Sequence, residues 1–280
     1  MASTKAKLAG GAGLFTGGIA VGRLMRLDSQ RGDYRKDWED HALATLSELR
    51  ALPKDVPDSE RPYTILALGD SAAQGIGANT VQEGYVPRFA AAVQQALGRE
   101  VALLNLSMSG ATAESMVLTQ LPQVKGLGLG TDIPIDLCVM DIGGNDVMLK
   151  TLPVESFEAR MDQIYRQLPE GSLIGNIANF GVLKNAELRA ADMSATMDRL
   201  AVQHGHHPVD LRAVTSAHSP VKYFTSRHAA DMFHPNSASY AEWAQEYLDV
   251  WSRITGTPAA PADQAPAWQF KSERVAQSLA

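Results

Sequence analysis

One apolar segment constrains the fold of this chain more than any other feature. The run 65–68, Ile-Leu-Ala-Leu, has the composition of a buried strand, and it ends in the turn Gly69-Asp70-Ser71. Downstream, similar apolar runs alternate with stretches of helical periodicity, which is typical of a parallel sheet covered by helices on both faces. Because open α/β sheets bind ligands beyond the carboxyl ends of their strands, Ser71 stands where such sites form.

This alternation predicts the elements of a single domain over residues 63–254. The expected strands are 63–69, 101–107, 135–142, 172–178 and 208–211. The expected helices are 86–97, 113–124, 154–168, 185–204 and 237–254. With right-handed crossovers the strand order becomes 2-1-3-4-5. The predicted fold class is therefore α/β, a three-layer α/β/α flavodoxin-like fold with a five-stranded parallel sheet.

Residues 1–27 predict a membrane anchor or signal segment. An uncharged run from residue 8 to residue 22 stands between basic residues, which is the layout of such segments. The basic residues are Lys5, Lys7, Arg23 and Arg26. A flexible or peripherally bound amino terminus is the alternative, because the run is glycine-rich and shorter than the ~20 apolar residues of a spanning helix. A membrane-anchored or exported protein is favoured weakly over a cytoplasmic one.

The other flanking segments carry no chemistry. Residues 28–62 predict an N-terminal helix over 33–52, ended by Pro53, and then a charged linker. Residues 255–280 are rich in Ala, Pro and Gln and predict a low-complexity tail of poor order. Trp268 and Phe270 in this tail could dock on the domain or on a membrane, and the sequence leaves both open.

Composition excludes several classes of protein. The chain of 280 residues has a net charge of −6 and no basic stripe, so nucleic acid is not an expected partner. Its one cysteine, Cys138, lies in an apolar run and is expected to be a buried core residue. The cluster from His204 to His207 is a weak metal candidate, because adjacent histidines before a strand are more often a solvated loop. No metal or cofactor is expected.

A serine hydroxyl needs a base to attack an ester, and the chain offers one. His234 is the candidate base, and Asp231, three residues earlier, is close enough to orient the imidazole. Taken alone, an Asp-x-x-His pair is more often a helix end or a surface pair.

The charge that develops on the substrate oxygen also needs hydrogen-bond donors. The backbone N–H groups of Ser71 and Gly110 and the side-chain amide of Asn145 are the candidates. Each such donor contributes roughly 10²–10³ in turnover, so Asn145 is expected to matter nearly as much as the proposed triad of Ser71, His234 and Asp231. An ordinary turn glycine and an ordinary Gly-Gly-Asn-Asp loop are the alternatives. Alanine at position 73 disfavours the Gly-x-Ser-x-Gly turn of the α/β-hydrolases.

Four sequence blocks together resemble the SGNH/GDSL hydrolase family. They are Gly69-Asp70-Ser71, the segment 105–110, Gly143-Gly144-Asn145-Asp146 and the segment 231–234. The blocks follow the family's order, each after an expected strand, within residues 63–251. The resemblance implies a cofactor-free esterase or lipase with Ser71, Asp231 and His234 as the catalytic triad. It also implies an oxyanion hole of Ser71, Gly110 and Asn145. Ala72 replaces the leucine that often follows the serine and touches no catalytic atom.

We therefore expect a serine ester hydrolase that cleaves carboxylic esters through an acyl-enzyme. Lipid or small acyl esters are favoured by the anchor candidate and by Met108, Met148 and Phe233 near the site. An acyltransferase or carbohydrate deacetylase with the same site is the nearest alternative. A catalytically silent ligand-binding or scaffold module is the alternative from another class. No motif identifies the residues that bind the substrate or the oligomeric state.

Overall fold

A computed structural model describes residues 5–181, 183–219, 223 and 225–271, with the backbone alone for residues 5–26 and 28. Its centre is a five-stranded parallel sheet in the order β2-β1-β3-β4-β5. The strands are β1 (Tyr63–Gly69), β2 (Val101–Asn105), β3 (Leu137–Asp141), β4 (Leu173–Gly175) and β5 (His207–Val209). The predicted fold class and strand order are confirmed. The last two strands are shorter than expected.

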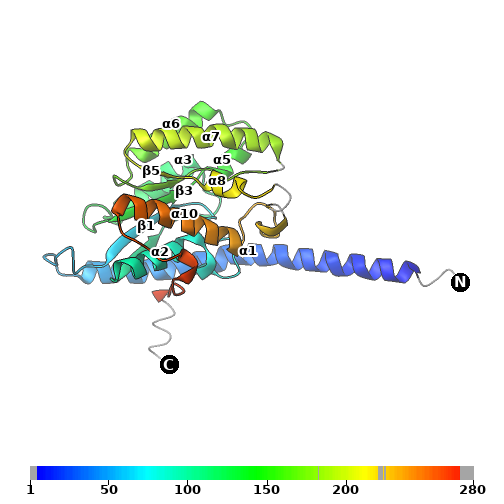
Figure 1. The fold of residues 1–280 in the computed structure, drawn as a ribbon, viewed down its shortest axis with the longest axis horizontal. Helices are drawn as coiled ribbons and strands as arrows, with labels where there is room; N and C mark the ends of the chain where they lie inside the picture. Colours follow the sequence, from blue (N-terminus) through cyan, green and yellow to red (C-terminus); the bar gives the residue numbers. More distant parts are fainter. Residues whose placement is uncertain (1–4, 182, 220–222, 224, 272–280) are drawn as a thin grey trace, which may run out of the picture.

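Helices cover both faces of this sheet, as Figure 1 shows. One apolar layer packs α2 (Tyr85–Leu97) and α10 (Ser237–Thr255) on the sheet. The opposite layer packs α6 (Val154–Tyr165) and α7 (Lys184–Gln203). The shorter helices are η1 (Val81–Glu83), α3 (Ala113–Ser115), η2 (Met116–Gln120), α4 (Leu121–Gly126), α5 (Gly144–Met148), α8 (Leu211–Ser216) and η3 (Ala262–Gln264). The sequence predicted the long helices but neither α5 nor α8.

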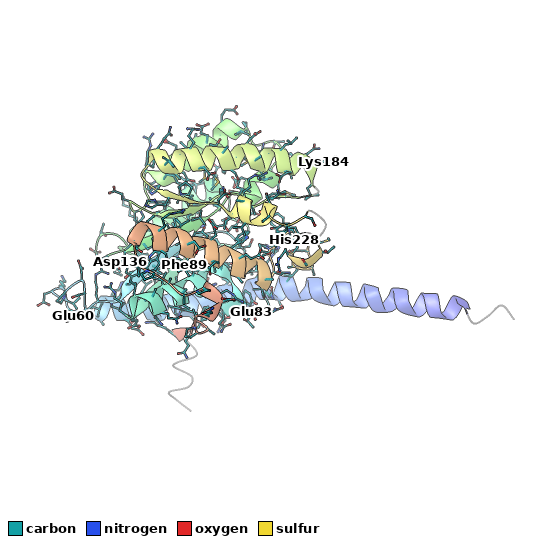
Figure 2. The ribbon with its side chains drawn as sticks, viewed as in Figure 1. Glu60, Glu83, Phe89, Asp136, Lys184 and His228 are labelled. Carbon is teal, nitrogen blue, oxygen red and sulfur yellow. The ribbon has the colours of Figure 1, made fainter. Side chains whose placement is uncertain are left out.

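Labelled side chains in Figure 2 mark the two ends of the sheet. Glu60 and Asp136 precede β1 and β3 and mark the amino end of the strands. Lys184 and His228 follow β4 and β5 in the chain and mark the opposite, carboxyl end. The candidate residues predicted from the sequence all follow strands, so they belong to this carboxyl end.

The first helix is much longer than the sequence predicted. α1 runs without a break over Lys5–Ala51, whereas the pattern placed a helix only at 33–52. Trp38 and Tyr34 in its second half are buried in the domain core. The second half of α1 therefore buries its apolar face against the same core as β1 and α10. Within the described residues, no helix combines the length and hydrophobicity needed to cross a membrane.

α1 also supports the segment that follows Ser71. The side chains of Gln30 and Tyr34 donate hydrogen bonds to the carbonyl of Ala78 at 2.9 and 3.1 Å. The indole of Trp38 donates to the carbonyl of Gln74 at 3.1 Å. Buried carbonyl groups need such partners, so α1 stabilises the conformation of residues 74–78.

The described part of the carboxyl-terminal tail is ordered, which corrects the expectation of poor order. Trp268 and Phe270 are 6% and 1% exposed. Phe270 packs on Trp38 of α1, with ring centroids 4.8 Å apart, and on His41, at 5.2 Å. The backbone N–H of Lys271 donates to His41 Nδ1 at 3.0 Å. Of the two alternatives left open, docking on the domain is what the structure shows, and residues 272–280 lie outside the described part of the chain.

Candidate active site

Ser71 lies in the turn that follows β1, where the chain leaves the sheet. It is 4% exposed, and its carbonyl accepts a hydrogen bond from the N–H of Ile76 at 3.0 Å. Its hydroxyl oxygen lies 2.8 Å from Nε2 of His234, although 163 residues separate the two in sequence. The fold therefore brings together the two residues that the sequence proposed as nucleophile and base.

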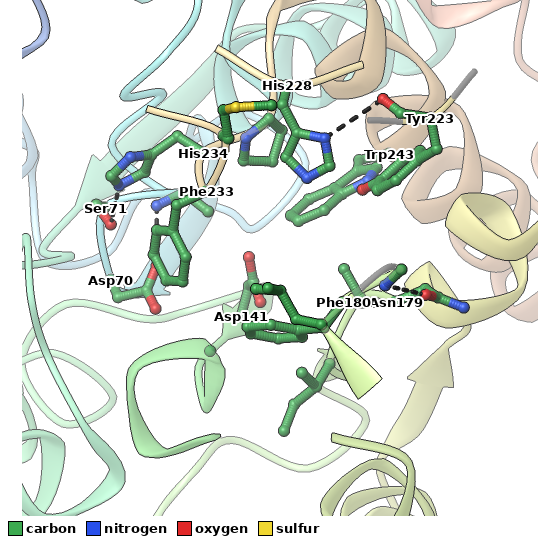
Figure 3. A pocket seen from close by; sticks show the side chains of 18 residues that line it. Asp70, Ser71, Asp141, Asn179, Phe180, Tyr223, His228, Phe233, His234 and Trp243 are labelled. Atoms are coloured by element: carbon green, nitrogen blue, oxygen red, sulfur yellow. Dashed lines mark hydrogen bonds between the residues drawn. The ribbon is translucent and has the colours of Figure 1, made fainter. Parts of the chain in front are cut away.

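His234 is held by a compact turn that begins at Asp231. Nδ1 of His234 lies 2.5 Å from Oδ2 of Asp231, and the other carboxylate oxygen accepts hydrogen bonds from the N–H groups of Phe233 and His234 at 3.1 and 3.0 Å. With Nδ1 donating to Asp231, the neutral imidazole presents Nε2 as an acceptor to the Ser71 hydroxyl. Figure 3 shows His234 beside Ser71 at one end of the pocket.

The charge of Asp231 is stabilised by this turn. Burial alone would raise the pKa of its carboxyl. The hydrogen bonds and charge of His234, with the backbone N–H groups, outweigh burial and lower the pKa to about 2. Asp231 is therefore a carboxylate at neutral pH, and it is suited to stabilise a positive charge on His234.

Gly110 and Asn145 also lie at the carboxyl end of the sheet. Gly110 has a φ of +77° and open space around the position of a Cβ atom, so the chain there is accessible to a substrate. Asn145 follows Gly143, whose φ of +112° strongly favours glycine. The Asn145 amide nitrogen donates to Oδ2 of Asp70 at 3.1 Å and to the carbonyl of Ala111 at 2.9 Å. Both hydrogens of this amide therefore have partners, and a substrate oxygen would have to share or replace one of them.

Two buried carboxyl groups in the site were missed by the sequence analysis. Asp70 and Asp141 are 7% and 8% exposed and end adjacent parallel strands, where Gly69 pairs with Asp141. Burial raises the pKa of Asp70 to about 6. Burial, and then the charge of Asp70, raises the pKa of Asp141 well above its usual range. The sequence does carry a signal for this pair. One aspartate stands just after a buried strand, and the other stands at the end of the neighbouring strand.

These residues and Ser71 line a pocket whose wall also includes Trp243 of α10. Its wall is mostly apolar and aromatic, and Figure 3 shows its labelled side chains around a central space. The aromatic members are Phe180, Tyr223, Phe233 and Trp243. Of the three apolar residues expected near the site, Phe233 lines the pocket. Met108 and Met148 are instead 39% and 46% exposed.

The histidine cluster considered as a metal site is separated from this pocket. Nε2 of His204 lies 2.9 Å from Oδ1 of Asp162, and Nε2 of His206 lies 2.9 Å from the carbonyl of Tyr165. Across the described part of the chain, no three His, Cys, Asp or Glu side chains are grouped so that they could hold a metal ion.

The fold, a five-stranded parallel sheet with helices on both faces, is that of the SGNH/GDSL hydrolases. A family model for the GDSL-like lipase/acylhydrolase family matches residues 67–242, and the chain belongs to this family. It is therefore an enzyme of the esterase and lipase class. No curated protein matches the sequence.

Solved structures share the same fold at low sequence identity. A lipolytic protein of the G-D-S-L family from Veillonella parvula has a TM-score of 0.57 and 16% identity, covering 68% of this chain and 99% of that one. The acetylxylan esterase Axe2 from Geobacillus stearothermophilus has a TM-score of 0.54 and 18% identity, covering 67% and 93%. An α/β hydrolase from the Lake Arreo metagenome has a TM-score of 0.53 and 22% identity, covering 67% and 94%.

Proposed function

We propose that this protein hydrolyses carboxylic esters through a covalent acyl-enzyme formed on Ser71. The observation that carries the proposal is the chain of hydrogen bonds from Ser71 through His234 to Asp231, at 2.8 and 2.5 Å. Membership of the GDSL-like lipase/acylhydrolase family supports small ester substrates.

In the first half of the reaction, His234 Nε2 takes the hydroxyl proton as Ser71 Oγ attacks the ester carbonyl carbon. The resulting imidazolium is stabilised by the carboxylate of Asp231. Collapse of the tetrahedral intermediate breaks the ester C–O bond, and His234 returns the proton to the departing alcohol. Water then attacks the acyl-enzyme by the same route, which releases the acid and restores Ser71.

The negative oxygen of the tetrahedral intermediate would be stabilised by donors at the carboxyl end of the sheet. We assign this role to the N–H groups of Ser71 and Gly110 and to the amide of Asn145. Its bonds to Asp70 and Ala111 hold the Asn145 amide at the site, and it acts as an oxyanion donor when a substrate oxygen shares or replaces one of these two acceptors.

Covalent labelling with a fluorophosphonate tests this proposal. We expect wild-type protein to be labelled at Ser71, Ser71→Ala to lose the label, and His234→Ala to be labelled at least 10³-fold more slowly. Mass spectrometry of the adduct identifies the modified residue. Labelling at another serine, or undiminished labelling of His234→Ala, would contradict the proposed roles. A folded wild-type protein that takes no label would favour the silent-module alternative.

Acyl transfer is the remaining chemical alternative, because the same acyl-enzyme can pass its acyl group to an alcohol. Competition distinguishes the two reactions. Hydrolysis predicts that an added alcohol or sugar leaves release of the acid from a p-nitrophenyl ester unchanged. A transferase would form the new ester at the expense of the free acid.

A further inference from the structure

One oxygen in the pocket stands out because it has no hydrogen-bond donor. Oδ2 of Asp141 is buried, and none of the described residues donates a hydrogen bond to it. Asp141 lines the pocket, and Figure 3 shows its carboxyl group directed into the space between Phe233 and Trp243. Because an unsatisfied buried acceptor costs free energy, a ligand donor that reached this oxygen would be favoured.

The titratable groups that share the pocket with Asp141 are a second carboxyl, Asp70, and the imidazoles of His228 and His234. Asp70 also lines the pocket, and its oxygens accept from Ala72 N–H at 2.9 Å and from Asn145. None of the described residues that line the pocket is a lysine or an arginine. The histidine ring of His234 already faces Asp231. When the carboxyls of Asp70 and Asp141 are ionised, the pocket is complementary to a positive group, which stabilises that ionised form, and opposes a negative one.

The walls of the pocket add a second attraction for a cation. Phe180, Phe233, Tyr223 and Trp243 lie around it, and the rings of Phe180 and Phe233 are 6.2 Å apart. Aromatic faces attract ammonium groups through the negative charge above their rings, and this attraction is strongest where water is excluded. A pocket with aromatic walls and one unsatisfied carboxylate oxygen matches an ammonium group better than it matches an alkyl chain.

We propose that the pocket beside Ser71 binds a positively charged amino group of the ester substrate, with Asp141 as its hydrogen-bond acceptor and counter-charge. This rests on the proposed esterase function and specifies its substrate class, namely esters that carry an ammonium group. Asp141 is then a specificity-determining residue. A substrate with a carboxylate or phosphate in this position would be excluded by Asp70 and Asp141.

Binding of small probes to the wild-type chain tests this proposal without requiring turnover. Isothermal titration calorimetry at pH 7.5 would compare n-butylammonium, 1-butanol and butyrate, which have the same carbon chain and differ in charge. We expect n-butylammonium to bind at least tenfold more tightly than 1-butanol, because hydrogen bonds to charged groups are the stronger ones. Butyrate is expected not to bind.

Variants identify the group responsible for this preference. Asp141→Asn keeps the shape of the side chain and is expected to lower the affinity for n-butylammonium about tenfold or more. The affinity for 1-butanol is expected to change little. Asp192→Asn removes the same charge from an exposed position on α7 and is expected to change neither affinity. Phe180→Leu keeps an apolar side chain and removes the aromatic ring. This substitution is expected to lower the affinity for n-butylammonium by about twofold to fivefold and to leave the affinity for 1-butanol unchanged.

Two results would overturn the proposal. One is equal or tighter binding of 1-butanol, which would make the pocket an alkyl-chain site. The other is unchanged n-butylammonium affinity in a folded Asp141→Asn protein, which would leave Asp141 a structural residue. Neither result depends on hydrolysis, so failure of this proposal and failure of fluorophosphonate labelling at Ser71 are separate outcomes.

Discussion

At the level of single residues, the site contrasts two kinds of carboxyl group. Asp231 has several hydrogen-bond donors and stays ionised, with its pKa lowered to about 2. Asp70 and Asp141 are buried beside each other, and burial raises the pKa of both carboxyls, although the charge of His234 partly offsets the rise at Asp70. The same residue type therefore serves opposite purposes, because the local donors and the exclusion of water decide the charge.

The raised pKa of Asp141 predicts a pH-dependent effect of Asp141→Asn on stability. A carboxyl whose pKa is higher in the folded state stabilises the fold below its unfolded pKa, near 4, and loses that contribution as the pH rises through the folded value. We therefore expect Asp141→Asn to have little effect at pH 4 and to be more stable than wild type at pH 8, by about 1–3 kcal/mol.

Chemical denaturation at both pH values checks this expectation. Asp192→Asn, at an exposed position, is the control and is expected to show no difference between the two pH values. A destabilised Asp141→Asn protein at pH 8 would mean that Asp141 is ionised and balanced in the fold.

At the level of elements, the tail and α1 form one packed unit with the domain. Phe270 and Trp268 cover His41 and Trp38, although more than two hundred residues lie between them. The carboxylate of Glu48 on α1 forms an ion pair with Lys271. Because α1 in turn supports residues 74–78, the tail is linked through one helix to the segment that follows Ser71.

This packing predicts that the tail contributes to stability rather than to chemistry. Phe270→Ala is expected to lower the free energy of unfolding by about 3–5 kcal/mol, because it removes a fully buried ring. The rate constant for fluorophosphonate labelling per folded molecule is expected to stay within a factor of two or three. Leu43→Ala, at a 67% exposed position on α1, is the matched control and is expected to change the free energy of unfolding little. Equal effects of the two substitutions would show that the tail is not packed in solution.

At the level of the whole molecule, the first half of α1 extends beyond the domain on the side where the strands end (Figure 1). His228 and Lys184 mark the same side in Figure 2. Several exposed apolar side chains belong to segments that follow strands and so lie toward this side: Met108, Met148, Leu183 and Met232. We propose that the amino-terminal helix and this end of the domain face a lipid surface.

Binding to vesicles tests this orientation. The full chain is expected to sediment with anionic phosphatidylglycerol vesicles and to be released by salt, since each basic residue near such a surface contributes about 1 kcal/mol. Replacing Lys5, Lys7, Arg23 and Arg26 by Gln should weaken binding at least tenfold. The control replaces four basic residues elsewhere, Lys54, Lys125, Arg166 and Arg253. Equal loss in both proteins, or no binding to vesicles at all, would contradict the proposed orientation.

The fold could be predicted from the sequence because its signals are local. Apolar runs and helical periodicity depend on neighbouring residues, so the order of strands and the long helices could be inferred along the chain. Ser71, Asp231 and His234 were proposed from short motifs, and the carboxyl end of a parallel sheet is a common meeting point for residues that follow its strands. α5 and α8 were missed because helices this short have too few residues to show a period.

Local sequence patterns are sufficient to specify the parallel sheet and the residues that reach its carboxyl end. Three features depend on contacts between distant segments: Asp70 and Asp141 lie together in one pocket, the Asn145 amide donates to Asp70, and Trp268 and Phe270 dock on α1. The two groups of features differ in how far apart along the chain the interacting residues are. Periodicity is set by residues a few positions apart, whereas burial, carboxyl ionisation and aromatic packing depend on groups that meet only when distant segments fold together.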